Sequence, residues 1–200
     1  MKKLLLAGLL AFAAVAALAQ NTDRPRIPEQ PVILVAAADL QGLYSRTALL
    51  VVPAAQGQHL GFILNRATDF KMATLFPEHA ASAKVADPVY FGGPERIESI
   101  FAVVRRDPGG PSLHLFGDVF VTGHGGAVDR IIESTPNDAR YFAGFVGWQG
   151  GELAKELEQG FWYLAEPDAA LLFSKDTAGM WEELVKRVGR HEPPAGMKSI

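Results

Sequence analysis

Short apolar runs rich in Val, Ile, Leu and Phe recur along the chain, separated by segments that contain Gly, Pro, Asn and Asp. Runs of this length and composition are typical of buried β-strands. We therefore expect strands at 32–35, 49–52, 60–64, 89–91, 100–104, 113–116, 119–122, 141–146 and 161–164. The segment Phe116-Gly117-Asp118-Val119 has the pattern of a tight hairpin turn, which predicts that the strands on either side of it are antiparallel.

Helical periodicity is weaker and is concentrated late in the chain. Apolar residues at three- and four-residue spacing predict helices at 127–133, 152–159 and 177–188. Gly160 and Gly189 follow two of these segments, and glycine is common directly after a helix. Because the strands come in succession and are not alternated with helices, the sequence predicts one compact α/β domain of the α+β type. Its sheet should be mixed or mostly antiparallel, with flanking helices.

Residues 1–19 have the anatomy of a secretory signal peptide. Lys2 and Lys3 precede an apolar run over 4–18, and Ala17-Leu18-Ala19 matches a cleavage site. The apolar run is shorter than the roughly 17–25 residues that span a bilayer. We expect Sec-type export, cleavage after Ala19, a periplasmic location and no membrane span after cleavage. An uncleaved anchor is the alternative. Residues 20–31 should form an extended arm, 32–189 the folded domain and 190–200 a flexible tail.

The composition narrows the class of protein. With 200 residues, 48% hydrophobic and 20% charged, the chain is neither disordered nor collagen-like. The absence of Cys from the sequence excludes a disulfide framework, thiolate metal sites and a cysteine nucleophile. Loss of Lys2 and Lys3 with the leader would change the net charge from −3 to −5, which argues against nucleic acid as a partner.

Three segments combine glycine with aromatic and polar residues. In 61–66, Arg66 offers a planar donor fork for a carboxylate or phosphate. In 90–94, two glycines before Pro94 can expose amide N–H groups to an anion. In 144–153, Trp148 precedes a helix and could pack over the core or serve as a platform for a ligand. For 61–66 and 90–94 a folding turn is the more common use of such residues, and for all three segments the sequence leaves both interpretations open.

The order of these motifs resembles the YqgE/AlgH family. The resemblance rests on G-F-I-L-N-R at 61–66, Y-F-G-G-P at 90–94 and G-W-x-x-G-E-L at 147–153 with Trp162 after it, and it covers 32–189. It implies a compact α/β domain without a particular chemistry. Part of the family is named for a regulator of exopolysaccharide synthesis, which gives a transcriptional regulator as an alternative that the export signal disfavours.

The chain also departs from the family pattern at several positions. Ala67 stands where Pro is usual and Glu152 where Gln is usual. The stretch at 123–126 is Gly-His-Gly-Gly, where Ser or Thr and Asp are usual. Family members are usually cytoplasmic, whereas this chain begins with an export leader.

These features favour a binding or regulatory role over an enzymatic one, with no cofactor. The partner would be an unidentified protein or a small anionic ligand. Arg66 would pair with an anionic group, Trp148 would provide an apolar platform, and the glycines would permit close backbone approach. The predicted surface consists of Asn65, Arg66, Phe91, Gly92, Gly93, Pro94, Gly147, Trp148, Gly151 and Glu152.

A hydrolase or metal-dependent enzyme is the competing hypothesis. His114 and His124 flank the predicted hairpin, so they could approach each other with Asp118 nearby and hold a metal ion. The sequence contains no H-x-x-x-H, H-E-x-x-H or G-x-S-x-G motif to support this hypothesis.

Overall fold

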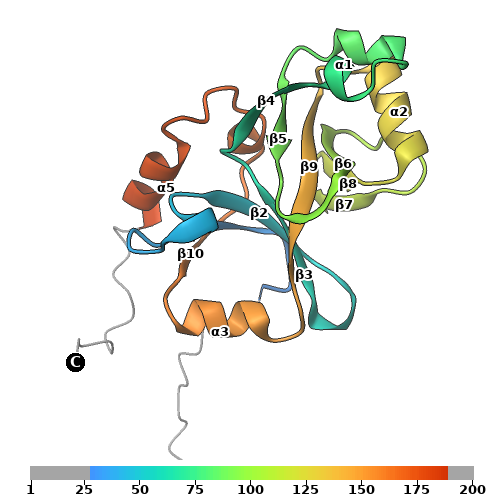
Figure 1. The fold of residues 1–200 in the computed structure, drawn as a ribbon. Helices are drawn as coiled ribbons and strands as arrows, with labels where there is room; N and C mark the ends of the chain where they lie inside the picture. The colour runs from blue at the N-terminus through green and yellow to red at the C-terminus, as the bar shows by residue number, and fades with distance from the viewer. Residues whose placement is uncertain (1–27, 189–200) are drawn as a thin grey trace, which may run out of the picture.

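The computed structural model describes residues 28–188. The predicted signal peptide at 1–19, most of the predicted arm and the predicted tail at 190–200 lie outside the described residues. In the described range, ten strands form one sheet with the order β10-β1-β2-β3-β9-β6-β8-β7, and β4 and β5 form a branch (Figure 1). The strands are β1 (Val32–Ala36), β2 (Ala48–Pro53), β3 (His59–Ile63), β4 (Ala67–Lys71), β5 (Pro88–Phe91), β6 (Glu95–Arg105), β7 (Leu113–Phe116), β8 (Val119–Thr122), β9 (Ala139–Trp148) and β10 (Trp162–Ala165).

Strand β9 is the point at which the sheet divides. One edge of β9 pairs with β6. The other edge pairs with β5 at Phe142 and Ala143, and then with β3 from Val146 to Trp148. The β5–β9 pair is parallel and the other pairs are antiparallel. The predicted α+β class with a mixed, mostly antiparallel sheet is therefore confirmed.

The helices lie in two groups. α3 and α5 lie near β10 and β1, whereas α1 and α2 lie at the far end of the molecule beside β4, β5 and β6 (Figure 1). The α-helices are α1 (Met72–Leu75), α2 (Gly125–Ser134), α3 (Glu152–Glu158), α4 (Ala169–Leu172) and α5 (Met180–Val188). Short 3-10 helices are η1 (Gly42–Tyr44), η2 (Ala55–Gly57) and η3 (Ala80–Lys84).

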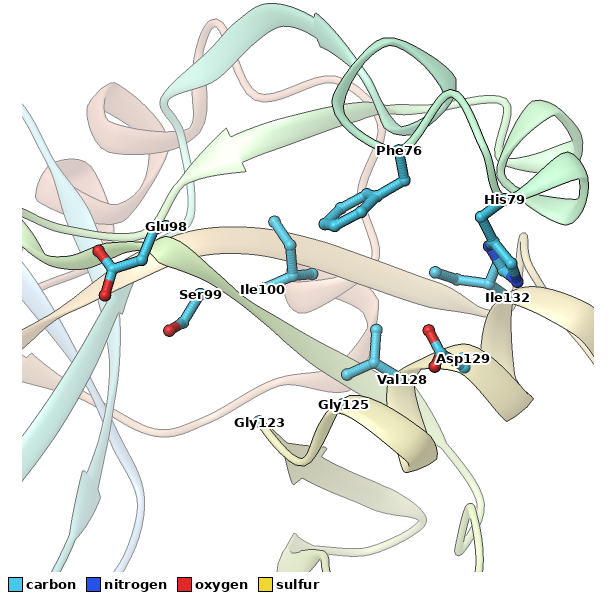
Figure 2. A pocket seen from close by; sticks show the side chains of 10 residues that line it. All are labelled: Phe76, His79, Glu98, Ser99, Ile100, Gly123, Gly125, Val128, Asp129 and Ile132. Atoms are coloured by element: carbon cyan, nitrogen blue, oxygen red, sulfur yellow. The ribbon is translucent and has the colours of Figure 1, made fainter.

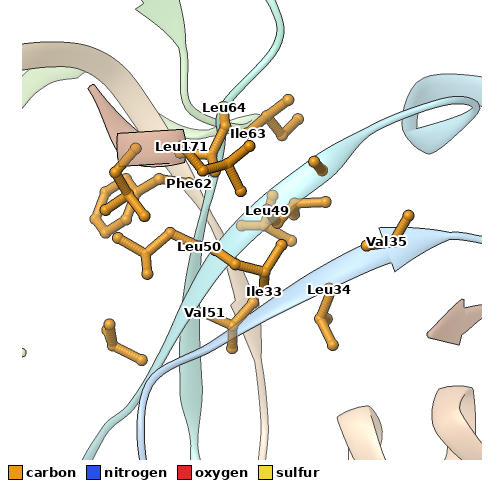
Figure 3. Packing of buried hydrophobic residues seen from close by; sticks show 14 of the residues in the cluster. Ile33, Leu34, Val35, Leu49, Leu50, Val51, Phe62, Ile63, Leu64 and Leu171 are labelled. Atoms are coloured by element: carbon orange, nitrogen blue, oxygen red, sulfur yellow. The ribbon is translucent and has the colours of Figure 1, made fainter. Parts of the chain in front are cut away.

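The larger hydrophobic cluster surrounds β1, β2 and β3 (Figure 3). Ile33, Leu34 and Val35 are consecutive in β1, and all three are fully buried. Successive side chains of a strand point to opposite faces, so both faces of β1 are covered. This explains why the strand appears in the sequence as a continuous apolar run and not as an alternating one.

A second cluster fills the space between α2 and the sheet. Val128, Ile131 and Ile132 of α2 are buried there with Val104 of β6 and Tyr141 of β9. The apolar residues of α2 follow three- and four-residue spacing, which is the pattern that predicted the helix. This packing fixes the position of α2 relative to β6.

Arg140 of β9 connects the elements that meet where the sheet divides. Its guanidinium, only 5% exposed, donates to the carbonyls of Leu172 (2.7 Å) and Leu64 (2.9 Å). It also lies over the ring of Tyr90, 3.9 Å from the centroid. Burial lowers the pKa of Arg140. One side chain thus joins α4, the end of β3 and β5.

Candidate functional site

Two of the three glycine-rich motifs lie side by side where the β4–β5 branch begins. The N–H of Phe91 donates to the carbonyl of Arg66 (2.8 Å), and the N–H of Ile63 donates to the carbonyl of Gly92 (3.0 Å). The structure therefore brings Asn65 and Arg66 next to Phe91 and Gly92, as the predicted surface requires.

Asn65 and Arg66 both bind the loop that precedes β2. Asn65 accepts from the N–H of Ala48 (3.0 Å) through Oδ1 and donates to the carbonyl of Arg46 (2.9 Å) through Nδ2. The exposed guanidinium of Arg66 donates to the carbonyl of Ser45 (2.8 Å). Asn65 thus has a folding role, whereas Arg66 retains donors that can face an outside group.

Gly92 and Gly93 pass too close to β9 to carry side chains. A Cβ at Gly92 would lie 2.2 Å from the carbonyl oxygen of Gly144, and a Cβ at Gly93 would lie 2.2 Å from the carbonyl carbon of Phe145. The N–H of Gly92 already donates to a β9 carbonyl (2.9 Å). Both glycines are thus required by the approach of two backbones, and the Gly92 amide is not free for an anion.

Trp148 is part of the core and is only 4% exposed. Its ring packs on Gly61, where a Cβ would lie 2.7 Å from the indole. Its Nε1–H donates to Oε2 of Glu156 (2.9 Å), and Nε1–H of Trp162 donates to the same oxygen (2.7 Å). In contrast to the expectation from the sequence, Trp148 offers no exposed platform, because one carboxylate holds both indoles inside the protein.

The Glu156 carboxylate also acts on Tyr44, whose ring packs against Trp162 with 6.0 Å between centroids. Burial raises the pKa of the Tyr44 phenol, and the nearby carboxylates of Glu156 and Glu95 raise it further. This cluster joins α3, β10 and η1 and gives the tryptophans of the third motif a role in stability.

The remaining residues of the third motif shape the turn into α3. The N–H of Gly147 donates to Oε1 of Glu95 (3.1 Å). Gly151 has a φ of 84°, a conformation that favours glycine. Oε2 of Glu152 accepts from the N–H of Gln149 (2.7 Å) at the start of the helix. These contacts account for the motif as a turn.

Arg66 and Trp148 do not lie in a common site. Arg66 is beside Phe91, which pairs with Ala143 of β9. Trp148 lies five residues further along β9, which corresponds to about 16 Å at the usual strand rise. The exposed Pro94 lies beside the stretch of β9 between them. The predicted surface is therefore divided into two parts.

The histidines of the competing hypothesis are also held apart. The predicted hairpin is present, with Phe116 opposite Val119. His114 lies opposite Phe120, and its Nε2 is 2.9 Å from the carbonyl of Gly117. His124 lies beyond the other end of β8, directly before α2. Over 28–188, no three His, Asp or Glu side chains are grouped as they would be to hold a metal ion.

An apolar region that the sequence did not indicate lies elsewhere, between β4, β5, β6 and α1. A cavity of about 370 Å³, the first cavity, opens there. A second cavity of about 270 Å³ adjoins it toward α2 and shares Phe76, Glu98 and Ile100 with it. We call the two together the apolar groove. Its apolar lining consists of Phe70, Leu75, Phe76, Val89, Phe91, Ile97, Ile100, Ala143, Val128 and Ile132.

Several large apolar side chains of the groove face solvent. Phe70 is 57% exposed, Ile97 55% and Phe76 42%. Figure 2 shows Phe76 pointing from the segment after α1 toward Ile100, with Val128 of α2 across the second cavity. An exposed cluster of this kind marks a surface that binds a partner or ligand more often than an isolated apolar residue does.

An irregularity in β6 creates one wall of the groove. Glu95 pairs with Phe145, whereas Ile100 pairs with Ala143, so the register shifts within 95–100. Arg96 adopts a φ of 48° at this point. Bulges of this kind redirect side chains and recur beside functional sites. The bulge here presents Ile97 to the first cavity and Glu98 to both cavities.

Of the predicted surface, only Phe91 lines the groove. The groove was missed because β4 and α1 are short, and β4 is largely exposed. A signal was nevertheless present: Phe70 and Met72 are followed by Leu75 and Phe76, and the last three have the three- and four-residue spacing of a helix. Only Met72 of the four is buried.

Within 28–188, every helix is too short or too polar to cross a membrane.

Comparison with known protein families matches most of the chain to one family. A family model described as AlgH-like (DUF179) matches residues 33–192. A UPF0301 protein of Chlorobium limicola is 30% identical over 162 residues, which cover 79% of this chain and 85% of the relative. A UPF0301 protein of Parabacteroides distasonis is 27% identical over 174 residues, covering 84% and 87%.

Solved structures share the fold at lower identity. The solution structure of the AlgH protein from Pseudomonas aeruginosa matches with a TM-score of 0.65 at 21% identity, covering 80% of this chain and 88% of that one. A crystal structure of a Corynebacterium diphtheriae protein matches with a TM-score of 0.66 at 22% identity, covering 82% and 89%.

Proposed function

This chain belongs to the AlgH-like family, and we propose that it acts as an exported binding protein that holds an apolar segment of a partner protein in the apolar groove. One observation carries the proposal: two adjoining cavities form a continuous apolar surface whose rim leaves Phe70 and Ile97 more than half exposed.

The groove can bury the apolar side chains of a protein segment. A partner side chain of the size of Leu or Phe gains about 1.5–3 kcal/mol when it is fully buried. The groove residues that it covers, among them Phe70 and Ile97, lose their own contact with water at the same time. Two anchoring side chains in the two cavities, together with the groove residues that they cover, therefore supply the main favourable contribution to set against the freedom lost on association.

The proposal of export rests on the leader pattern at 1–19. A periplasmic location would separate the protein from DNA, and the net charge of −3 lacks the excess of basic residues that is typical of nucleic-acid-binding proteins. A direct role in transcription is therefore not favoured. A hydrolase built on His114 and His124 is not favoured either, because His114 pairs opposite Phe120 near the start of β8, whereas His124 follows the far end of that strand.

Photo-crosslinking in living cells tests the binding role. A photoreactive amino acid is placed at Phe70 or Ile97 in the full chain, and at Leu113 as a matched control. Leu113 is 49% exposed but lies on β7, outside the groove. We expect the same protein adduct from the first two positions and none from Leu113. Equal adducts from all three positions, or adducts from Leu113 alone, would contradict the proposal.

Cell fractionation tests the export step separately. The full chain expressed in a Gram-negative host should be recovered from the periplasm with a mass that corresponds to a chain beginning at Gln20. Recovery of the intact chain from the cytoplasm would contradict export without affecting the groove.

A further inference from the structure

We propose that the apolar groove selects segments in which basic residues flank the bulky apolar ones. This inference rests on the proposed function and names the chemistry of the partner. It starts from the charged side chains of the groove. The lining of the two cavities includes the carboxylates of Glu98 and Asp129, and it includes neither Lys nor Arg.

Both carboxylates are available to a partner. Glu98 and Asp129 are exposed, and neither forms an ion pair or a side-chain hydrogen bond within residues 28–188. The nearby Glu133 differs, since its carboxylate lies 3.7 Å from Nε2 of His79. Nδ1 of His79 is in turn 2.9 Å from Oγ of Ser82. The two free negative charges of the groove are therefore Glu98 and Asp129.

The two carboxylates lie at different places along the groove, where an extended segment can reach both. Glu98 borders both cavities, so it lies next to the place where an anchoring side chain enters either one. Asp129 lies on α2, toward the other end of the second cavity from Glu98 (Figure 2). A segment that runs along the groove with an apolar anchor can thus place a Lys or Arg near each end, where a cation meets an unpaired carboxylate.

The charges should act on selectivity more than on affinity. An ion pair in an exposed position changes an affinity by about two- to fivefold. Two such pairs, replaced by two repulsive contacts in an acidic segment, separate basic from acidic segments by about tenfold or more. The difference should shrink as salt is added, because exposed charges are screened.

Fluorescence anisotropy with three labelled peptides tests the inference. The peptides share the same Phe and Leu anchors and differ only in their flanking residues, which are Lys, Gln or Glu. The protein is purified after expression of the full chain. We expect the Lys peptide to bind most tightly and the Glu peptide most weakly, with about a tenfold spread at low salt.

Two double variants identify the residues responsible. Glu98→Gln with Asp129→Asn should abolish the spread, so that the Lys, Gln and Glu peptides bind this variant with similar affinity. Asp39→Asn with Glu158→Gln makes the same change in net charge at exposed positions outside the groove, and it should keep the spread.

The outcomes separate the two proposals. If the wild-type protein binds the three peptides equally, or if both double variants lose the spread alike, charge selection by Glu98 and Asp129 is wrong and the binding groove remains. If the Gln peptide does not bind, or binds as well to an Ile97→Ser variant as to the wild type, the groove is not a binding site and both proposals fail.

Discussion

At the scale of single residues, Glu156 explains the roles of Trp148 in the third motif and of Trp162 after it. Both indole N–H groups are buried, and both donate to one carboxylate oxygen. In the sequence, Glu156 stands in a helical segment beside Lys155 and Glu158, and a carboxylate among charged residues usually faces water. Trp148 and Trp162 lie eight and six residues away in the sequence. No sequence pattern indicates that two tryptophans share one acceptor.

Removing this acceptor should destabilise the protein strongly. In Glu156→Ala, two buried donors lose their partner, at about 1–3 kcal/mol each. Glu156→Gln retains an acceptor oxygen and should recover most of the loss. Urea unfolding measures both variants. Glu158→Ala, exposed on the same helix, should change the free energy of unfolding by less than about 0.5 kcal/mol. A Glu156→Ala variant as stable as this control would contradict the shared-acceptor role.

At the scale of elements, the two backbones that cross at 92–93 and 144–145 determine what the second motif does. A sequence can show that Gly92 and Gly93 permit unusual backbone. It cannot show that β9 passes 2.2 Å from where a side chain would begin. The anion-binding and folding interpretations therefore stayed open until the strands were placed.

Gly93→Ala should be among the most damaging single-methyl changes in the chain. The added Cβ meets backbone atoms of Phe145, which cannot move aside as a flexible side chain can. We expect a loss of about 3 kcal/mol or more, or failure to fold. Gly125→Ala serves as the control, because its Cβ would have no atom within 4 Å. Thermal unfolding compares the two, and equal stability would show that the crossing is not close.

The elements that the sequence predicted best are the buried ones. β1 and β2 follow the predicted runs to within about one residue, because burial on both faces requires continuous apolar sequence. β4 and the first half of β6 were not predicted, since an exposed edge and a bulge need no apolar pattern. These are the elements that build the groove, so the candidate site was the part least visible in the sequence.

At the scale of the whole molecule, the free energy of unfolding should fall at alkaline pH because of Tyr141. Burial raises the pKa of this phenol above its ordinary value, and Asp138 raises it further. As pH rises above about 10, the unfolded chain releases the phenol proton while the folded chain still holds it. The stability that Tyr141 contributes is therefore complete below about pH 10 and is lost progressively above it.

A pair of variants checks this dependence. Tyr141→Phe loses a hydrogen bond to the carbonyl of Pro136 (3.1 Å), at about 0.5–1.5 kcal/mol near neutral pH. It should also reduce the fall in unfolding free energy between about pH 9 and pH 12. The control Tyr163→Phe changes an exposed ring and should follow the wild-type curve. A wild-type fall that Tyr141→Phe does not reduce would contradict the assignment.

The location of the binding surface determines which backbone amides change their chemical shifts when a peptide binds. An isotope-labelled sample is titrated with the apolar peptide flanked by Gln, and the amide chemical shifts are followed by NMR. We predict that the largest changes fall within 68–76, 97–100 and 123–129, the segments that line the apolar groove. The largest changes at 147–152, or at the edge strand β10 (Trp162–Ala165), would contradict it.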